Sequence, residues 1–281
     1  MKPIVAIVAQ GAMGAGLAKR LTDHGVEVLT SLSGRGEQSR ARAAAAGMRA
    51  VGLPDLMEAQ FLLSILPPAG ALPFAVDMAP ILRAAHRKPV FVDCNAVSPE
   101  TVRSIADSLR ETAAAFVDVG IIGLPPQEGS PGPRLYAAGE SARGLRILNE
   151  YGLSICLLEG PVGTASALKM SYAGITKGLT AVATAMILSA SRAGVGNALR
   201  DELEASAPTL LASLARGLPD MLPKAYRWVA EMEQIRQFVG ADTAARKIYE
   251  GAEHLYERMA ADVAGGHAEA DAILHFFGKP N

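Results

Sequence analysis

Short hydrophobic runs alternate with helical stretches from the N-terminus to about residue 160. The predicted strands cover residues 4–8, 26–30, 61–66, 90–94, 115–119, 135–138 and 154–158. Helical stretches separate several of them, and Pro99 stands in the first turn of one over residues 98–109. This alternation predicts a parallel sheet with helices on both faces, a fold whose ligands bind beyond the carboxyl ends of the strands.

The pattern changes after Gly163. Residues 164–192 contain no proline and predict one long helix, and the rest of the chain shows only helical periodicity interrupted by glycines and prolines. We therefore expect two domains: an α/β domain of the Rossmann type, with a doubly wound parallel sheet, over residues 1–162, and an all-helical domain over residues 163–281. The long interdomain helix belongs to the second domain.

The first strand ends in a turn of small residues and leads at once into a helix. Residues 9–14 read Ala-Gln-Gly-Ala-Met-Gly, which aligns with the G-x-G-x-x-G turn if Ala9 replaces the first glycine. We expect this alanine to strain the turn. A dinucleotide-binding turn needs close approach of the backbone to a pyrophosphate at a helix N-terminus. The predicted cofactor contacts there are Gly11, Ala12, Met13 and Gly14.

The end of the second strand indicates which dinucleotide is bound. NAD-binding versions of the fold carry an acidic residue there, but this chain has no carboxylate between Thr30 and Glu37. Ser33 and Arg35 suit a 2′-phosphate, because arginine offers a planar fork of donors to phosphate oxygens. We therefore expect NADP rather than NAD. In the alternative interpretation, Arg35 is a solvated loop charge.

Composition narrows the remaining possibilities. Half of the 281 residues are hydrophobic, a fifth are charged, and the formal net charge is −1, which gives no general attraction to nucleic acid or anionic membranes. No uninterrupted apolar run approaches the ~20 residues of a membrane span. The two cysteines suggest neither a metal site nor a disulfide framework. We expect a cytoplasmic protein without a bound metal.

Four segments, in the same order, resemble the β-hydroxyacid dehydrogenase superfamily, which includes 3-hydroxyisobutyrate and 6-phosphogluconate dehydrogenases and, more distantly, imine reductases. The first is the turn at residues 11–14. Residues 64–67 resemble the loop along the cofactor, which implies cofactor contacts from Leu66 and Pro67. Residues 92–99 resemble the segment that places Asn95 beside the nicotinamide. Residues 160–169 resemble the start of the interdomain helix, with Lys169 as the catalytic lysine. The helical domain resembles a divergent branch.

The chain departs from this family where the substrate binds. In residues 118–124, Ile122, followed by Gly123, replaces the family's substrate-binding serine, and Ala173 replaces its asparagine. The resemblance implies that these three positions contact the substrate. Tyr172 shares a helix face with Lys169 and can donate a hydrogen bond to the substrate oxygen. Arg227 is a candidate for binding an anionic group of the substrate.

These observations predict an NADP-dependent oxidoreductase that interconverts a small hydroxy compound, most simply a hydroxy acid, with its carbonyl form. Hydride transfer needs a group that exchanges the hydroxyl proton, and Lys169 is the candidate. Two alternatives remain open: an imine reductase-like enzyme with a less polar pocket, and a catalytically inactive NADP-binding protein. The expected partners are a small-molecule substrate and a second copy of the chain, bound through the helical domain.

Overall fold

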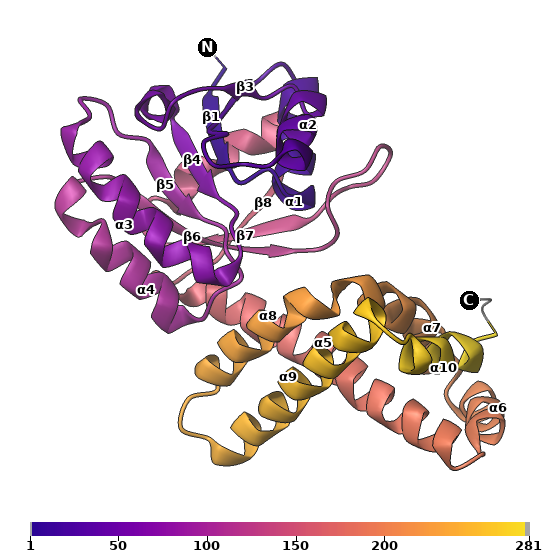
Figure 1. Cartoon of the computed structure of the whole chain (residues 1–281). Helices are drawn as coiled ribbons and strands as arrows, with labels where there is room; N and C mark the ends of the chain where they lie inside the picture. The colour runs from indigo at the N-terminus through magenta and orange to yellow at the C-terminus, as the bar shows by residue number, and fades with distance from the viewer. Residues whose placement is uncertain (1, 279–281) are drawn as a thin grey trace. The chain divides into compact units, whose positions relative to one another are not determined.

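The computed structural model describes residues 2–278 and separates into two compact units, residues 1–170 and 171–281 (Figure 1). The division falls inside the long helix, whereas the sequence pattern places the domain boundary at the start of that helix, after residue 162. The two units are described separately below.

The first unit is built on one eight-stranded sheet in the order β3-β2-β1-β4-β5-β6-β7-β8. Neighbouring strands are parallel except β6 and β7, which pair antiparallel. The chain runs outward from β1 to β3 and then returns to β4 on the other side of β1, so a topological switch point lies between β1 and β4. The predicted doubly wound α/β fold is confirmed. The strands are β1 (Ile4–Val8), β2 (Glu27–Thr30), β3 (Arg49–Ala50), β4 (Phe61–Ser64), β5 (Val90–Asp93), β6 (Phe116–Ile122), β7 (Arg134–Ala138) and β8 (Ser154–Leu157).

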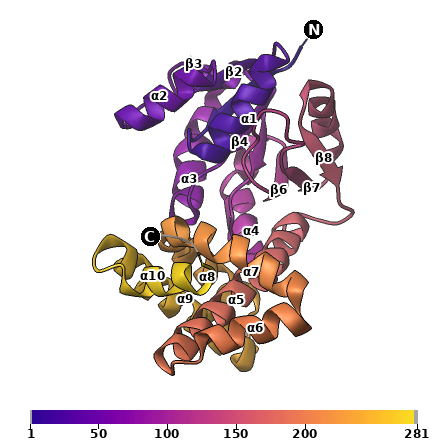
Figure 2. The same ribbon diagram turned by 90° about the vertical axis from the view of Figure 1, so that its right-hand side faces the viewer.

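Helices cover both faces of this sheet (Figures 1 and 2). One hydrophobic core holds residues of α1 (Ala12–Asp23), α2 (Glu37–Ala45) and the 3-10 helix η3 (Ala142–Tyr151). A second core, on the opposite face, holds residues of η1 (Pro54–Glu58), α3 (Pro68–Ala84) and α4 (Pro99–Ser108), which η2 (Arg110–Thr112) follows. Because both faces are covered, the strands are buried and read as continuous apolar runs.

Strand β6 extends three residues beyond the predicted end at residue 119 and stops at Ile122. A Cβ atom at Gly120 would lie 2.7 Å from the Ala165 carbonyl oxygen and 3.1 Å from Cβ of Lys169. Glycine is therefore needed because the start of a helix packs directly on the strand, and the strand itself continues.

The second unit is entirely helical in the part that the structure describes. The long helix α5 (Thr164–Arg192) has the bounds that the sequence predicts, and its first turns belong to the first unit. It is followed by α6 (Gly196–Ser206), α7 (Pro208–Met221), the 3-10 helix η4 (Leu222–Lys224), α8 (Ala225–Phe238), α9 (Thr243–Ala264) and α10 (Ala268–Phe276). Helices α8 and α9 pack along one another, and Met232, Ile235, Tyr256 and Met259 are buried between the helices of this unit.

By length and composition alone, α5 is the one described helix that could cross a membrane. This differs from the expectation that no segment approaches a membrane span. The mean hydropathy of its most apolar 18 residues is 1.3, and 44% of that stretch is buried inside the protein. A core helix of a water-soluble protein passes the same test.

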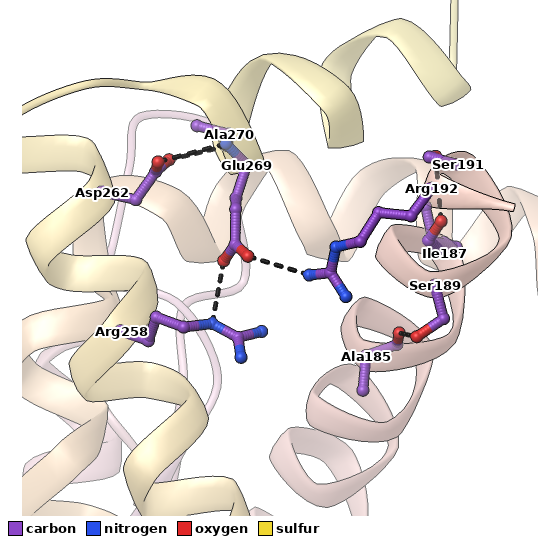
Figure 3. Close-up of polar contacts among 9 residues, drawn as sticks. All are labelled: Ala185, Ile187, Ser189, Ser191, Arg192, Arg258, Asp262, Glu269 and Ala270. Carbon is purple, nitrogen blue, oxygen red and sulfur yellow. Dashed lines mark hydrogen bonds and ion pairs between the residues drawn. The ribbon is translucent and has the colours of Figure 1, made fainter.

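Charged side chains fix the last helix to its neighbours (Figure 3). The Asp262 carboxylate accepts hydrogen bonds from the backbone N–H groups of Glu269 and Ala270, in the first turn of α10. Glu269 in turn accepts from Arg258 of α9 and Arg192 of α5, both at 3.0 Å. The three-residue ion cluster therefore ties together α5, α9 and α10 within the helical unit.

Candidate cofactor and proton-transfer site

The predicted dinucleotide turn lies at the carboxyl end of β1, beside the switch point. Gly11 is the N-cap of α1 and has no side chain with which to cap the first N–H groups of the helix. A Cβ atom at Gly14 would lie 2.0 Å from the Ala9 carbonyl oxygen, so α1 begins in close contact with the turn. A Cβ at Gly11 would meet no atom within 4 Å, so the space in front of the helix is open.

The expected strain at Ala9 does not take the form of a left-handed backbone. Among residues 2–278, only Ala113 and His267 combine a side chain with a positive φ. The first position of this turn therefore does not need the left-handed backbone that glycine allows.

Gln10, in the same turn, links β1 to the end of β2. Its side-chain amide donates to the Thr30 hydroxyl and, at 2.9 Å, to the Ser31 carbonyl oxygen. Its own backbone carbonyl accepts from Nε of Arg42, on α2, at 2.7 Å. Gln10 is fully buried, and within the described residues no donor reaches its Oε1. Neither residue was predicted as a site residue, because Gln10 occupies a variable position of the glycine pattern and Arg42 lies outside it.

The loop after β2 carries Ser33, which is exposed, and Arg35, which is half-buried. Arg40 of α2 holds the loop by donating from its guanidinium to the carbonyl oxygens of Leu32 and Arg35, at 3.2 and 3.1 Å. The shape of this loop is therefore held by the Arg40 side chain through backbone carbonyl groups.

The loops after β4 and β5 are joined through the side chain of Asn95. Its Oδ1 accepts from the backbone N–H of Leu66 at 2.6 Å. Its Nδ2 donates to Oγ of Ser64 at 3.1 Å and to Oδ2 of Asp93 at 2.6 Å. Asn95 and Leu66 thus lie together, and Pro67 follows at the exposed start of α3. The Asn95 amide, however, is buried and bonded within the protein.

Two buried carboxylates stand side by side at this edge, because β5 pairs Asp93 with Asp118 of β6. Burial, reinforced by the charge of Asp118, raises the pKa of Asp93 to about 7 despite its bonds from Asn95. Burial also raises the pKa of Asp118, although the hydroxyl and backbone N–H of Ser166 oppose that shift. The neighbouring Cys94 thiol has a raised pKa through burial, so it is held in its neutral form.

Asp118 fixes the start of α5. One of its oxygens accepts from the N–H groups of Gly163, Ala165 and Ser166 at 2.9–3.1 Å, and the other accepts from the Ser166 hydroxyl at 2.7 Å. A carboxylate at a helix N-terminus satisfies donors that the helix cannot pair and favours the helix dipole. Lys169 follows on the same helix, half-buried, with its Cβ packed over Gly120 of β6. The structure therefore places Lys169 at the carboxyl edge of the sheet.

The other residues predicted to contact the substrate differ in how far they are exposed. Ile122 is half-buried at the end of β6, and Gly123 is exposed with a φ of +129°. Tyr172 is exposed on α5, whereas Ala173 is only 2% exposed. Arg227 is exposed on α8, so it remains available to an anion. Tyr172, Ala173 and Arg227 belong to the helical unit, whereas Ile122 and Gly123 belong to the first unit.

A second lysine of α5, Lys177, is partly buried against α8. Its ammonium group forms an ion pair with Glu231 and lies 4.9 Å from the centre of the Trp228 ring. Burial lowers the pKa of Lys177, and Glu231 opposes that shift. Tyr256 donates to the Lys177 carbonyl oxygen at 2.6 Å, so this cluster belongs to the packing of α5, α8 and α9.

The residues at the edge fit a dinucleotide. The turn offers unpaired helix N–H groups facing open space, a close-packed glycine behind them, and an orphaned buried Oε1 on Gln10. No group of three His, Cys, Asp or Glu residues that could hold a metal ion occurs within residues 2–278.

Family models match most of both units. Residues 4–142 match the model described as the NAD binding domain of 6-phosphogluconate dehydrogenase. Residues 190–259 match a domain of unknown function, DUF1932. The first match covers the turn, both loops and β6, and the second covers α6 to most of α9.

Solved structures agree with this assignment. The conserved protein MTH1747, described as structurally similar to 3-hydroxyacid dehydrogenases, is 28% identical, with 92% of this chain and 97% of that one covered and a TM-score of 0.69. The 3-hydroxyisobutyrate dehydrogenase of Mycobacterium tuberculosis is 18% identical, with coverages of 94% and 96% and a TM-score of 0.74. An imine reductase variant from Myxococcus stipitatus is 22% identical, with coverages of 99% and 100% and a TM-score of 0.61. The last two likenesses show the fold alone.

Three findings agree with the family resemblance seen in the sequence: the glycine turn at the switch point, the family model over the nucleotide domain, and the similarity to MTH1747. The chain belongs to the β-hydroxyacid dehydrogenase superfamily of NAD(P)-dependent dehydrogenases and reductases, and its C-terminal helical domain is of the DUF1932 type.

Proposed function

We propose that this protein is an NADP-dependent oxidoreductase that interconverts a small hydroxy compound, most simply a hydroxy acid, with its carbonyl form. One observation carries the proposal: Lys169 is fixed over Gly120 at the same carboxyl edge of the sheet that bears the dinucleotide turn. A proton-transfer group and a cofactor turn on one edge are what hydride transfer to or from an alcohol carbon requires.

Each part of the edge has a separate task. When bound, the nicotinamide supplies or accepts the hydride. Gly11, Ala12, Met13 and Gly14 bind the pyrophosphate through the N-terminus of α1. Lys169 gives a proton to the carbonyl oxygen from its Nζ or takes one from the hydroxyl. Asp118 holds α5, and with it Lys169, in place.

The preference for NADP is supported by the loop after β2. It offers the hydroxyl of Ser33 and the guanidinium of Arg35 and has no carboxylate before Glu37. A carboxylate there would repel a 2′-phosphate, whereas arginine binds phosphate oxygens in a planar fork. NAD is the less favoured cofactor.

Replacing Arg35 by alanine should weaken NADPH binding much more than NADH binding. The loss of one charge-assisted contact corresponds to about 1.5–3 kcal/mol, or roughly 10- to 150-fold in the dissociation constant. The measurement is a fluorescence titration of both cofactors. Arg87→Ala is the matched control, because Arg87 precedes β5 and therefore lies toward the opposite edge of the sheet. Equal losses for NADPH and NADH would remove Arg35 from this role.

Two other functions remain candidates. An imine reductase-like activity is favoured by the apolar, half-buried Ile122 at a position where the family has a substrate-binding serine, which suits a less polar C=N bond. A catalytically inactive NADP-binding protein would bind the cofactor and turn over nothing. A panel of hydroxy acids with NADP⁺, and of aldehydes and cyclic imines with NADPH, separates the three functions. Oxidation of hydroxy acids supports the proposal, and imine reduction alone supports the first alternative. Cofactor binding without turnover supports the second.

We also propose that the protein acts on this small substrate in the cytoplasm as a homodimer, associated through its helical domain. The supporting feature is an apolar stripe on α5. It consists of five large side chains that are 46–71% exposed and follow one another at alternating spacings of three and four residues. Apolar residues at this spacing line the contact between paired helices, and monomeric soluble proteins rarely expose such a patch. The stripe consists of Tyr172, Ile175, Leu179, Val182 and Met186.

Replacing Leu179, in the middle of the stripe, by aspartate should convert a dimer to a monomer. Both copies of the carboxylate would be buried in a two-fold interface, and a central anchor is worth at least about 2 kcal/mol, or roughly 30-fold in the dissociation constant. Sedimentation over a concentration series measures the change. Leu210→Asp on α7, a less exposed leucine outside the stripe, is the control. A wild-type chain that sediments as a monomer would contradict the proposal.

A further inference from the structure

A clamp of three polar side chains, Ser64, Asp93 and Asn95, joins the ends of β4 and β5. All three are at least 97% buried. The side-chain amide of Asn95 donates one hydrogen to Ser64 and the other to Asp93, and its oxygen accepts from the backbone N–H of Leu66. Its backbone N–H donates to the other oxygen of Asp93 at 3.1 Å. The side chain of Asn95 therefore connects two loops and has no amide hydrogen left for a ligand.

We propose that Asp93 is a positioning residue, which acts through Asn95 to hold the loop after β5 against the loop after β4 in the shape that binds the nicotinamide half of the dinucleotide. This inference rests on the proposed cofactor site.

The geometry needs a carboxylate at this position. Asp93 faces two N–H donors of Asn95, one from the backbone and one from the side chain, and receives one on each oxygen. An ionised carboxylate accepts on both oxygens, and such charge-assisted bonds are about twice as strong as neutral ones. Asparagine offers a single oxygen and would turn an amide group toward the second donor. The substitution Asp93→Asn thus removes one bond of the clamp with little change of volume.

The clamp is also sensitive to pH. The titratable groups that act on Asp93 are Asp118 on β6 and the adjoining Cys94, and β4 presents the Ser64 hydroxyl. Burial raises the pKa of Asp93 from 3.8 to about 7. Ionisation above pH 7 strengthens the bonds to Asn95, so cofactor affinity should rise with pH. Folding stability should change in the opposite direction. The raised pKa of Asp93 stabilises the folded protein fully below pH 3.8, and this contribution is lost as the pH rises through 7.

The test measures dissociation constants of NADPH and NADH at pH 6 and pH 8 for the wild-type chain and for Asp93→Asn. The wild-type protein should bind about 10-fold more tightly at pH 8, the effect of one charge-assisted hydrogen bond. Asp93→Asn should show the weaker affinity at both pH values. NADH is included because it lacks the 2′-phosphate, whose own titration near pH 6 affects NADPH. Asp77→Asn, an exposed aspartate on α3, is the control.

A double-mutant cycle tests whether Asp93 acts through Asn95. Asn95→Ala should weaken binding, and adding Asp93→Asn to it should cost nothing more. A purely structural role for Asp93 would lower the melting temperature and leave the pH dependence of binding intact, and that result would overturn the inference. If Asp93→Asn does not fold, Ser64→Ala loosens the same amide, and an unchanged affinity would overturn it equally. A wild-type chain that binds neither dinucleotide would instead overturn the proposed function, and this inference with it.

Discussion

Replacing Gly14 by valine is expected to abolish the binding of NADPH and NADH. Even a single carbon at this position would lie 2.0 Å from the Ala9 carbonyl oxygen and 3.2 Å from its carbon. Both atoms belong to the backbone and cannot rotate away. The first turn of α1 would have to move off the end of β1, and its N–H groups would leave the position where they face the pyrophosphate. Titration of intrinsic cofactor fluorescence should detect no binding.

Such a clash can also damage the fold, so a second variant separates the two effects. A side chain at Gly11 would meet no protein atom within 4 Å, and its backbone, with φ of −71°, suits any residue. Gly11→Val should therefore fold normally and still weaken cofactor binding, because it fills the space in front of the helix. Gly144→Val, on η3, introduces the same side chain at an equally open position away from the turn. Full cofactor affinity in a folded Gly11→Val protein would mean that the turn is not the binding site.

The strands and the long helix could be predicted because each depends on local pattern. Buried parallel strands appear as short apolar runs, and α5 appears as a stretch without proline. The two-residue strand β3 is too short and too exposed to produce such a pattern. The extension of β6 to Ile122 could not be predicted either, because Gly120 is required by contact with Ala165 and Lys169, which are distant in sequence.

The site residues also fall into those that local sequence reveals and those that depend on contacts between distant segments. The glycine turn was visible as a motif, and Lys169 and Asn95 through the family resemblance. Asp93, Asp118 and Gln10 were missed as partners because their roles arise from pairing between strands and loops, as when β5 sets Asp93 opposite Asp118. The ion pair of Lys177 with Glu231 shows the limit most clearly: helix spacing pairs Glu231 with Arg227, but the packing of α5 on α8 provides a different cation.

Replacing Lys169 by alanine should leave cofactor binding nearly intact and lower turnover by roughly 10²- to 10⁴-fold, the usual contribution of a positioned acid or base. Lys169 lies on the part of α5 that Asp118 anchors, and its Cβ packs over Gly120, so the truncation removes the proton-transfer group while the helix keeps its place. The measurement is kcat/KM with the best substrate of the panel, together with the dissociation constant of NADPH. Lys247→Ala, an exposed lysine on α9, is the control.

Two further variants show whether the proton passes through Lys169. Gly120→Ala keeps the lysine but pushes its helix away from β6, so it should lower kcat with little effect on cofactor affinity. Tyr172→Phe removes at most one hydrogen bond, on the order of 1 kcal/mol, and should cost less than a 10-fold loss. Added alkylamines should partly restore the activity of Lys169→Ala, because they supply the missing ammonium group. If Lys169→Ala is mild and Tyr172→Phe is the more damaging change, the proton comes from the tyrosine, and imine reduction becomes the better account of the altered pocket.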